Sequence, residues 1–140
     1  YLMKQYVYEV LQEASKKTSE TDKVKVLRDN ESWALKDILR GTLDSTVEWN
    51  LPKGEPPYIK SDGHNHATNL LRANTQFKYF TKNGPGSKMP AVKREKIFIG
   101  LIEGVHPEDA QLVINMVNKT PVEGVSKDVV KEAFPGLLKD

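Results

Sequence analysis

The chain has 140 residues, of which 38% are hydrophobic and 29% charged, with a net charge of +2 and no cysteine. These values are typical of a soluble globular domain. The lack of cysteine excludes disulfides, thiolate zinc sites and cysteine nucleophiles. No apolar run approaches the roughly 20 residues needed to span a bilayer. We therefore expect one domain over residues 1–140, with no membrane association.

The first third of the chain predicts three helices. Apolar residues at three- and four-residue steps indicate an amphipathic helix from Leu2 to about Lys17. The polar link that follows offers Ser19 or Thr21 as the N-cap of a short helix, and Asn30 as the cap of the next. The apolar residues expected in that third helix are Trp33, Leu35, Ile38, Leu39 and Leu43.

Two loops rich in proline and glycine interrupt the middle of the chain, near 49–66 and 82–90. Between them, helical spacing resumes at about Ala67 and continues to Phe80.

The last third predicts further helices. Residues 91–104 place Val92 and Phe98 on one apolar side, Pro107 begins a helix that runs through Val117, and Ser126 caps a final short helix. The chain is therefore predicted to be all-α, with about six or seven helices.

Lys60-Ser61-Asp62-Gly63 matches K-x-D-G, in which nucleotidyltransferases place the lysine that is adenylated or guanylated. Such enzymes need a pocket of two sheets and further metal-binding carboxylates, whereas the residues after Gly63 read as helices. We interpret the match as a loop turn. His64 and His66 beside it supply too few ligands for a zinc site. We expect a non-catalytic protein without metal or cofactor.

A basic segment gives the clearest functional signal. From Arg72 to Lys96 there are seven basic residues and one acid, Glu95, with the aromatic residues Phe77 and Tyr79 among them. Lysine and arginine near aromatic rings are typical of nucleic-acid surfaces, because phosphate contacts release counterions. A merely solvated face is the alternative.

The stretch "EDAQLVINMVNKTPVEGVSKDVVKEAFPGLL" resembles the end of the helical N-terminal DNA-binding domain of ATP-dependent DNA ligases from T-even-like phages. The shared features are a turn at 124–126, a short helix, and an aromatic-Pro-Gly-Leu sequence that begins at Phe134. Lys119 stands where the ligase pattern has an arginine. In those ligases the catalytic lysine follows this domain, whereas Lys60 precedes it. The resemblance implies a DNA-binding fold without the catalytic half.

The whole chain is also similar to a family of small uncharacterised proteins of T-even-like marine phages, through segments such as "SWALKDILRGT", "WNLPKGEPPY" and "REKIFIGLIEGVHPEDA". This similarity suggests Met3 as the natural start and the cytoplasm of an infected bacterial host as the location.

Together these observations favour an accessory protein of replication or repair that binds duplex or nicked DNA without sequence preference. The candidate DNA contacts are Lys82, Lys88, Lys93, Arg94, Lys96, Lys119 and Lys127. The alternative is a module that binds a phage or host protein. Its candidate anchors are Trp49, Pro56, Pro57 and Tyr58. The oligomeric state stays open.

Overall fold

The computed structural model describes residues 6–140, and these residues form seven α-helices, one 3₁₀-helix and two isolated β-bridges. The helices are α1 (Val7–Lys16), α2 (Glu20–Asp29), α3 (Trp33–Leu43), α4 (Leu70–Ala73), the 3₁₀-helix η1 (Asn74–Phe80), α5 (Ala91–Gly104), α6 (Pro107–Val117) and α7 (Lys127–Ala133). The all-α prediction is confirmed. The start of the first predicted helix, with Met3, lies outside the described residues. Among residues 6–140, no helix has the length and apolar character to cross a membrane.

Four helices of the described chain begin with a side-chain cap, in which an oxygen accepts a hydrogen bond of 3.1–3.2 Å from the N–H three residues later. The capping residues are Ser19, Ser32, Asn69 and Ser126. Asn30 does not cap α3, so that prediction was wrong. It ends α2 instead, and its Nδ2 donates to the carbonyl of Val26 at 2.9 Å.

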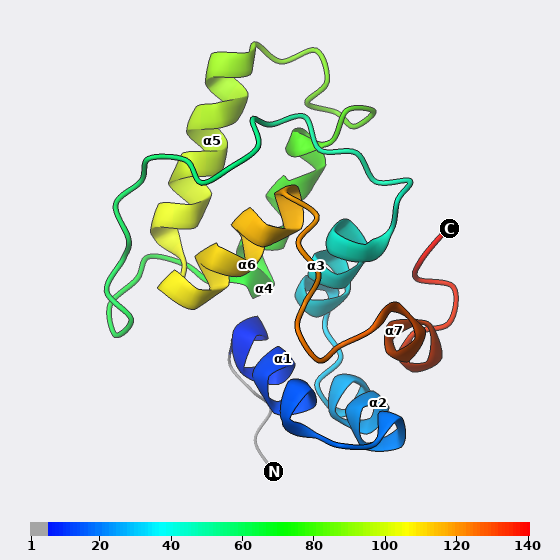
Figure 1. The fold of residues 1–140 in the computed structure, drawn as a ribbon. Coiled ribbons are helices and arrows are strands. Elements are labelled where there is room, and N and C mark those ends of the chain that lie inside the picture. The colour runs from blue at the N-terminus through cyan, green and yellow to red at the C-terminus, as the bar shows by residue number, and fades with distance from the viewer. Residues whose placement is uncertain (1–5) are drawn as a thin grey trace.

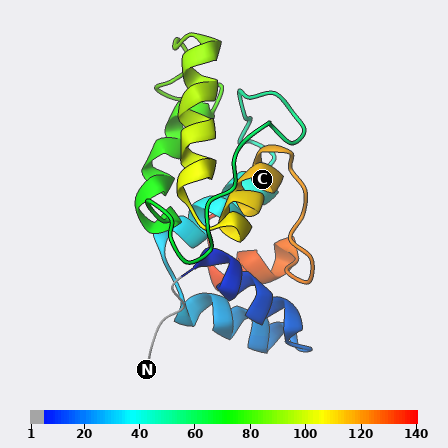
Figure 2. The ribbon, with the colours of Figure 1, turned by 90° about the vertical axis from the view of Figure 1, so that its left-hand side faces the viewer.

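The helices form two groups joined by α3 and α6. At one end α2 packs against α1 and α7, and at the other end η1 packs against α4 and α5 (Figures 1 and 2). Between them, α6 contacts α1, α3 and α5, while α3 also contacts α4 and η1. The long connection between α3 and α4 runs across one side of this arrangement (Figure 1).

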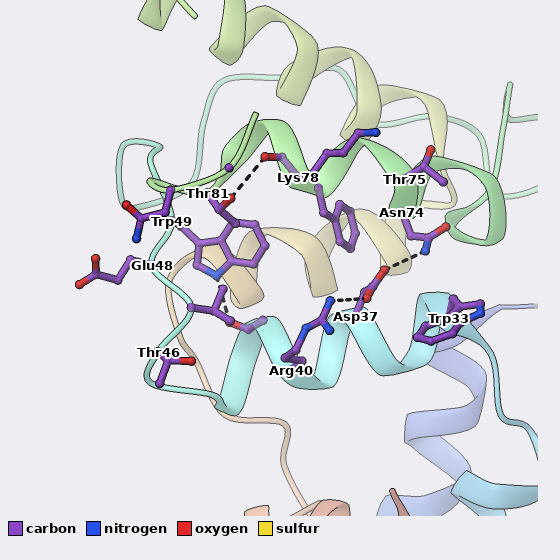
Figure 3. Close-up of a pocket in the computed structure, with 15 residues that line it drawn as sticks. Trp33, Asp37, Arg40, Thr46, Glu48, Trp49, Asn74, Thr75, Lys78 and Thr81 are labelled. Atoms are coloured by element: carbon purple, nitrogen blue, oxygen red, sulfur yellow. Dashed lines mark hydrogen bonds and ion pairs between the residues drawn. The ribbon is translucent and has the colours of Figure 1, made fainter. Parts of the chain in front are cut away.

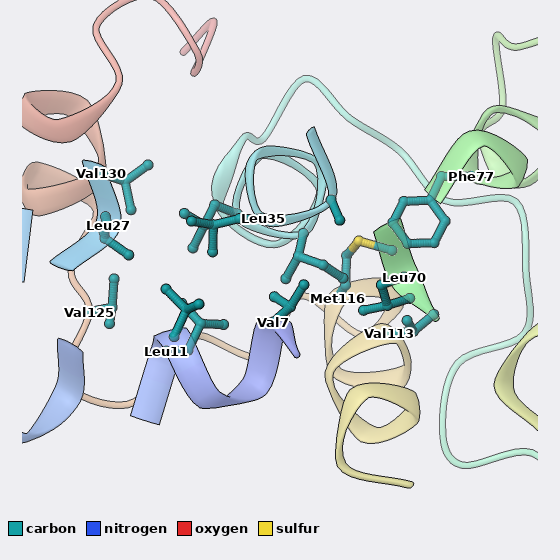
Figure 4. Packing of buried hydrophobic residues seen from close by; sticks show 14 of the residues in the cluster. Val7, Leu11, Leu27, Leu35, Leu70, Phe77, Val113, Met116, Val125 and Val130 are labelled. Atoms are coloured by element: carbon teal, nitrogen blue, oxygen red, sulfur yellow. The ribbon is translucent and has the colours of Figure 1, made fainter. Parts of the chain in front are cut away.

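One continuous core links the two groups. Figure 4 follows it from Leu27 and Val130, past Leu35, to Met116 and Phe77. The helix predicted from Pro107 to Val117 is α6, and its apolar residues Ala110, Val113, Ile114 and Val117 are buried. Burial of such apolar area is the main favourable term in folding.

The helix predicted over residues 67–80 is two shorter elements. α4 has 4 residues, and the chain then tightens into the 3₁₀-helix η1. A threonine and several aromatic residues, which have lower helix propensity, lie in this run. The tighter winding still buries Phe77 and Phe80, and it leads directly into the second loop.

Candidate nucleic-acid interface

The loop after η1 lies close against η1 at two glycines, which have no side chain to prevent the contact. A Cβ atom on Gly84 would lie 2.3 Å from the carbonyl oxygen of Lys78, and one on Gly86 would lie 2.2 Å from that of Tyr79. No side chain fits at such distances, so both positions require glycine. The loop 82–90 is therefore a close-packed structure that presents its lysines from a fixed backbone.

Arg94 joins this loop to the other long loop. Its side chain is only 7% exposed. Nε donates to the carbonyl of Asn50 at 2.8 Å, and Nη1 donates to the carbonyl of Met89 at 2.9 Å. A guanidinium committed in this way stabilises the fold and is not available to a phosphate. The prediction of Arg94 as a DNA contact is therefore corrected.

Unlike Arg94, the lysines of this region lie at the surface. Those exposed are Lys78, Lys82, Lys88, Lys93 and Lys96. Within residues 6–140 none of them forms an ion pair. We call residues 78–96 the lysine segment.

On α5, Lys93 and Lys96 are three residues apart and so share one outer side of the helix. Val92, predicted to face the core, is instead 67% exposed beside them. The core side of α5 is formed by Phe98, Leu101 and Ile102, which are buried. The outer side of α5 thus combines two cations with one apolar side chain.

Lys119 and Lys127, the two candidates from the ligase-like stretch, are engaged within the chain. Lys119 has a positive φ of 57° and donates from Nζ to the carbonyl of Asp44 at 2.7 Å. Burial lowers its pKa, although nearby Asp44 and Asp140 oppose this shift. Lys127 pairs with Asp140 at 2.7 Å. Neither lysine is presented freely as the sequence led us to expect.

The four predicted partner anchors do not form an exposed patch. Trp49 packs against the core, donates from Nε1 to the carbonyl of Gly41 at 2.9 Å, and meets Phe77 edge-on. Tyr58 is also half-buried, and burial raises its pKa. Pro56 is half-buried and only Pro57 is exposed. The large hydrophobic side chain that this loop exposes is that of Ile59, at 81%, two residues after Pro57.

Trp33 lies in α3, as the sequence predicts, but it is not part of the buried stripe of that helix. The indole is 70% exposed, at one end of a groove of about 630 Å³ between α3 and η1, while Trp49 closes the other end (Figure 3). Between them, Arg40 pairs with Asp37 at 2.8 Å. The signal was present: Trp33 precedes Leu35 by two residues, and residues two apart on a helix do not share a face.

The K-x-D-G tetrapeptide forms a surface turn. The Asp62 carboxylate accepts from the N–H of His64 at 2.8 Å, and the Asp62 carbonyl accepts from Asn65 at 3.2 Å. Lys60 is exposed beside it. Among the described residues, no three histidine or acidic side chains gather as metal ligands.

One buried carboxylate stands out at the start of α6. Asp109 is 1% exposed and accepts a hydrogen bond of 2.9 Å from the backbone N–H of Tyr8, in the first turn of α1. Burial raises the pKa of Asp109 to about 6, although the hydrogen bond from Tyr8 opposes the rise. This side chain joins two helices.

Fold and surface together define a small all-helical domain with a fixed, lysine-bearing loop and helix. The chain belongs to a family of unknown function (DUF6433), whose model matches residues 10–122. The match includes the lysine segment and Trp33, but it ends before Lys127. No curated protein matches the chain.

Proposed function

We propose that the protein binds DNA without sequence preference, as a non-catalytic accessory protein in phage replication or repair. The observation that carries the proposal is the lysine segment, where five lysines are exposed and form no ion pair within residues 6–140. Because the backbone is already fixed, binding a phosphate orders only the lysine side chains and not the chain that carries them.

The resemblance to the ligase DNA-binding domain supports the same ligand. It does not supply the contact residues, because Lys119 and Lys127 are engaged by Asp44 and Asp140. We therefore assign the phosphate contacts to Lys82, Lys88, Lys93 and Lys96, with Lys78 added from the structure.

A salt-dependent titration of labelled duplex DNA tests this proposal. Affinity is expected to fall steeply with salt and to be equal for unrelated sequences. The double substitution Lys93→Gln/Lys96→Gln should weaken binding and reduce the slope of log K against log salt by about 2, since each phosphate contact contributes about 0.9.

The matched control is Lys16→Gln/Lys17→Gln, which removes the same charge from two exposed lysines at the end of α1. If both double variants lose equal affinity, the binding depends only on net charge and the assignment to the lysine segment fails. If the unmodified protein binds neither duplex nor nicked DNA at low salt, the proposed function is wrong.

Docking on a phage or host protein is a second proposal, and Ile59 is the observation that favours it. Its apolar side chain is 81% exposed, two residues after the exposed Pro57, and offers a small anchor for a partner. An Ile59→Ser variant that loses a co-purifying partner while keeping its DNA affinity would support this proposal.

A further inference from the structure

The exposed indole of Trp33 needs an explanation beyond folding. Apolar area stabilises a fold in proportion to the area removed from water, so a side chain that stays 70% exposed contributes little. Trp33 lies at the first turn of α3, between the groove of Figure 3 and a second hollow of about 520 Å³. We call this second space the Trp33 hollow.

The Trp33 hollow carries an excess of positive charge. It lies between α2, the start of α3 and the segment that follows α7, and Pro135 and Gly136 form part of its rim. Its charged lining consists of one carboxylate, Glu31, and four cations: Arg28, Lys36, Arg40 and Lys139.

Two of these four cations form no ion pair among the described residues. Glu31 pairs with Lys36, and Arg40 pairs with Asp37. Arg28, which is exposed whereas Arg94 is buried, donates to the carbonyls of Glu132 and Ala133 at 2.8 and 3.1 Å, and these bonds orient the guanidinium without cancelling its charge. The Lys139 side chain is exposed and has no ion pair among the described residues.

We infer that the Trp33 hollow binds an unpaired segment of nucleic acid, with a base stacked on the Trp33 indole and phosphates beside Arg28 and Lys139. A base is flat and apolar on its faces, and its phosphate is anionic, so one nucleotide matches both features. Proteins that hold single strands combine aromatic platforms with cations in this way. An acidic peptide would match the cations alone and leave the indole uncovered.

This inference rests on the proposed function only for the class of ligand, which is nucleic acid. It assigns a second site, and this site prefers unpaired bases. In a duplex the faces of the bases are covered by their neighbours, so a base must be unpaired to reach Trp33. The lysine segment, by contrast, needs only phosphates. The two sites together would suit DNA that carries both a duplex and a single-stranded part.

Tryptophan fluorescence tests the inference directly. A short oligothymidylate, titrated at low salt, is expected to quench the emission of Trp33. Trp33→Ala should abolish the quenching and weaken binding about tenfold, which is the scale of one base–aromatic stack. Lys139→Gln, which leaves Trp33 in place, should weaken binding and lower the salt slope by about 0.7. Circular dichroism and the remaining Trp49 emission report whether each variant is folded.

Duplex titrations separate this inference from the proposed function. Lys93→Gln/Lys96→Gln should weaken duplex binding and leave the oligothymidylate quenching unchanged. If Trp33→Ala binds oligothymidylate as tightly as the unmodified protein, the inference is overturned while the duplex result stands. If polyglutamate at equal charge quenches Trp33 and displaces the oligonucleotide equally well, the hollow is a site for acidic peptides and the inference is also overturned.

Discussion

The two tryptophans of the chain lie near opposite ends of α3, and their surroundings differ. At the C-terminal end, Trp49 packs on Gly41, where an added Cβ would lie 2.5 Å from the indole and 2.6 Å from the sulfur of Met116. At the N-terminal end, Trp33 is 70% exposed, with Lys36 Nζ 5.0 Å from its ring centroid. The C-terminal end of α3 is therefore closed by packing, and we call it the closed end. The N-terminal end leaves its indole accessible to a ligand, and we call it the open end.

The difference shows that residue type does not decide whether an aromatic side chain serves folding or binding. Trp49 lies in a loop, yet the antiparallel bridge to Thr81 and the hydrogen bond to Gly41 bring it onto the core. Trp33 lies in a helix, but on the side opposite its buried stripe. What decides the role is the backbone that positions each ring.

The largest expected effect is at the closed end. Trp49→Ala removes an indole packed against Gly41 and Phe77 together with its hydrogen bond, and should lower the free energy of unfolding by about 3 kcal/mol. Urea denaturation followed by circular dichroism measures this loss. A loss below about 1 kcal/mol would mean that Trp49 is not the packing element we describe, since buried tryptophans normally cost more.

The next effect depends on pH and concerns Asp109 on α6, the helix that packs against α3. Its pKa is about 6 because the carboxyl is buried, so the folded protein holds the proton more tightly than the unfolded chain does. This contribution to stability is therefore present at low pH and is lost as pH rises through about 6. Between about pH 4 and about pH 7 the loss should reach about 2 kcal/mol, at roughly 1.4 kcal/mol per pKa unit.

Asp109→Asn isolates that contribution. The amide oxygen still accepts from the Tyr8 N–H, but the side chain no longer titrates. Denaturation at several pH values should therefore show the protein losing stability relative to this variant as pH rises. Parallel curves for the two proteins would contradict the assignment.

A smaller effect is expected at Asp44, which follows the closed end of α3. Its side chain accepts from the N–H of Thr46 at 2.9 Å and from the N–H of Lys139 at 2.8 Å. Burial by itself raises the pKa of Asp44, but these hydrogen bonds outweigh it and the pKa is lowered. The carboxylate thus stabilises the fold above its ordinary pKa, and this is lost as the pH falls through the lowered value.

Asp44→Ala should lower the free energy of unfolding by about 1.5 kcal/mol, because the backbone N–H groups of Thr46 and Lys139 lose their acceptor. Amide exchange should accelerate at Thr46 and Lys139 while α3 stays protected. Asp128→Ala, at an exposed position in the first turn of α7, is the control. Equal effects of the two substitutions would remove the role we give to Asp44.

The helices of this fold could be predicted because their signals are local. Apolar periodicity and caps such as Ser126 identify α3, α6 and α7 from neighbouring residues alone. The roles of Arg94 and Lys119 could not be predicted, because each depends on carbonyls far away in the chain, at Asn50 and Asp44. A cluster of cations in the sequence therefore contains both structural and free members, and the fold separates them.

The smallest expected effect on stability is at the open end. Trp33→Ala removes little buried area, so it should cost only about 0.5 kcal/mol, the scale of an exposed cation–π contact. Lys36 stays in place without the indole, because it also lies over the Phe134 ring at 5.3 Å and pairs with Glu31. Urea denaturation of this variant beside Trp49→Ala gives the comparison. If Trp33→Ala lowered the free energy of unfolding as much as Trp49→Ala does, Trp33 would be part of the packed fold. Its exposure would then no longer support a ligand site in the Trp33 hollow.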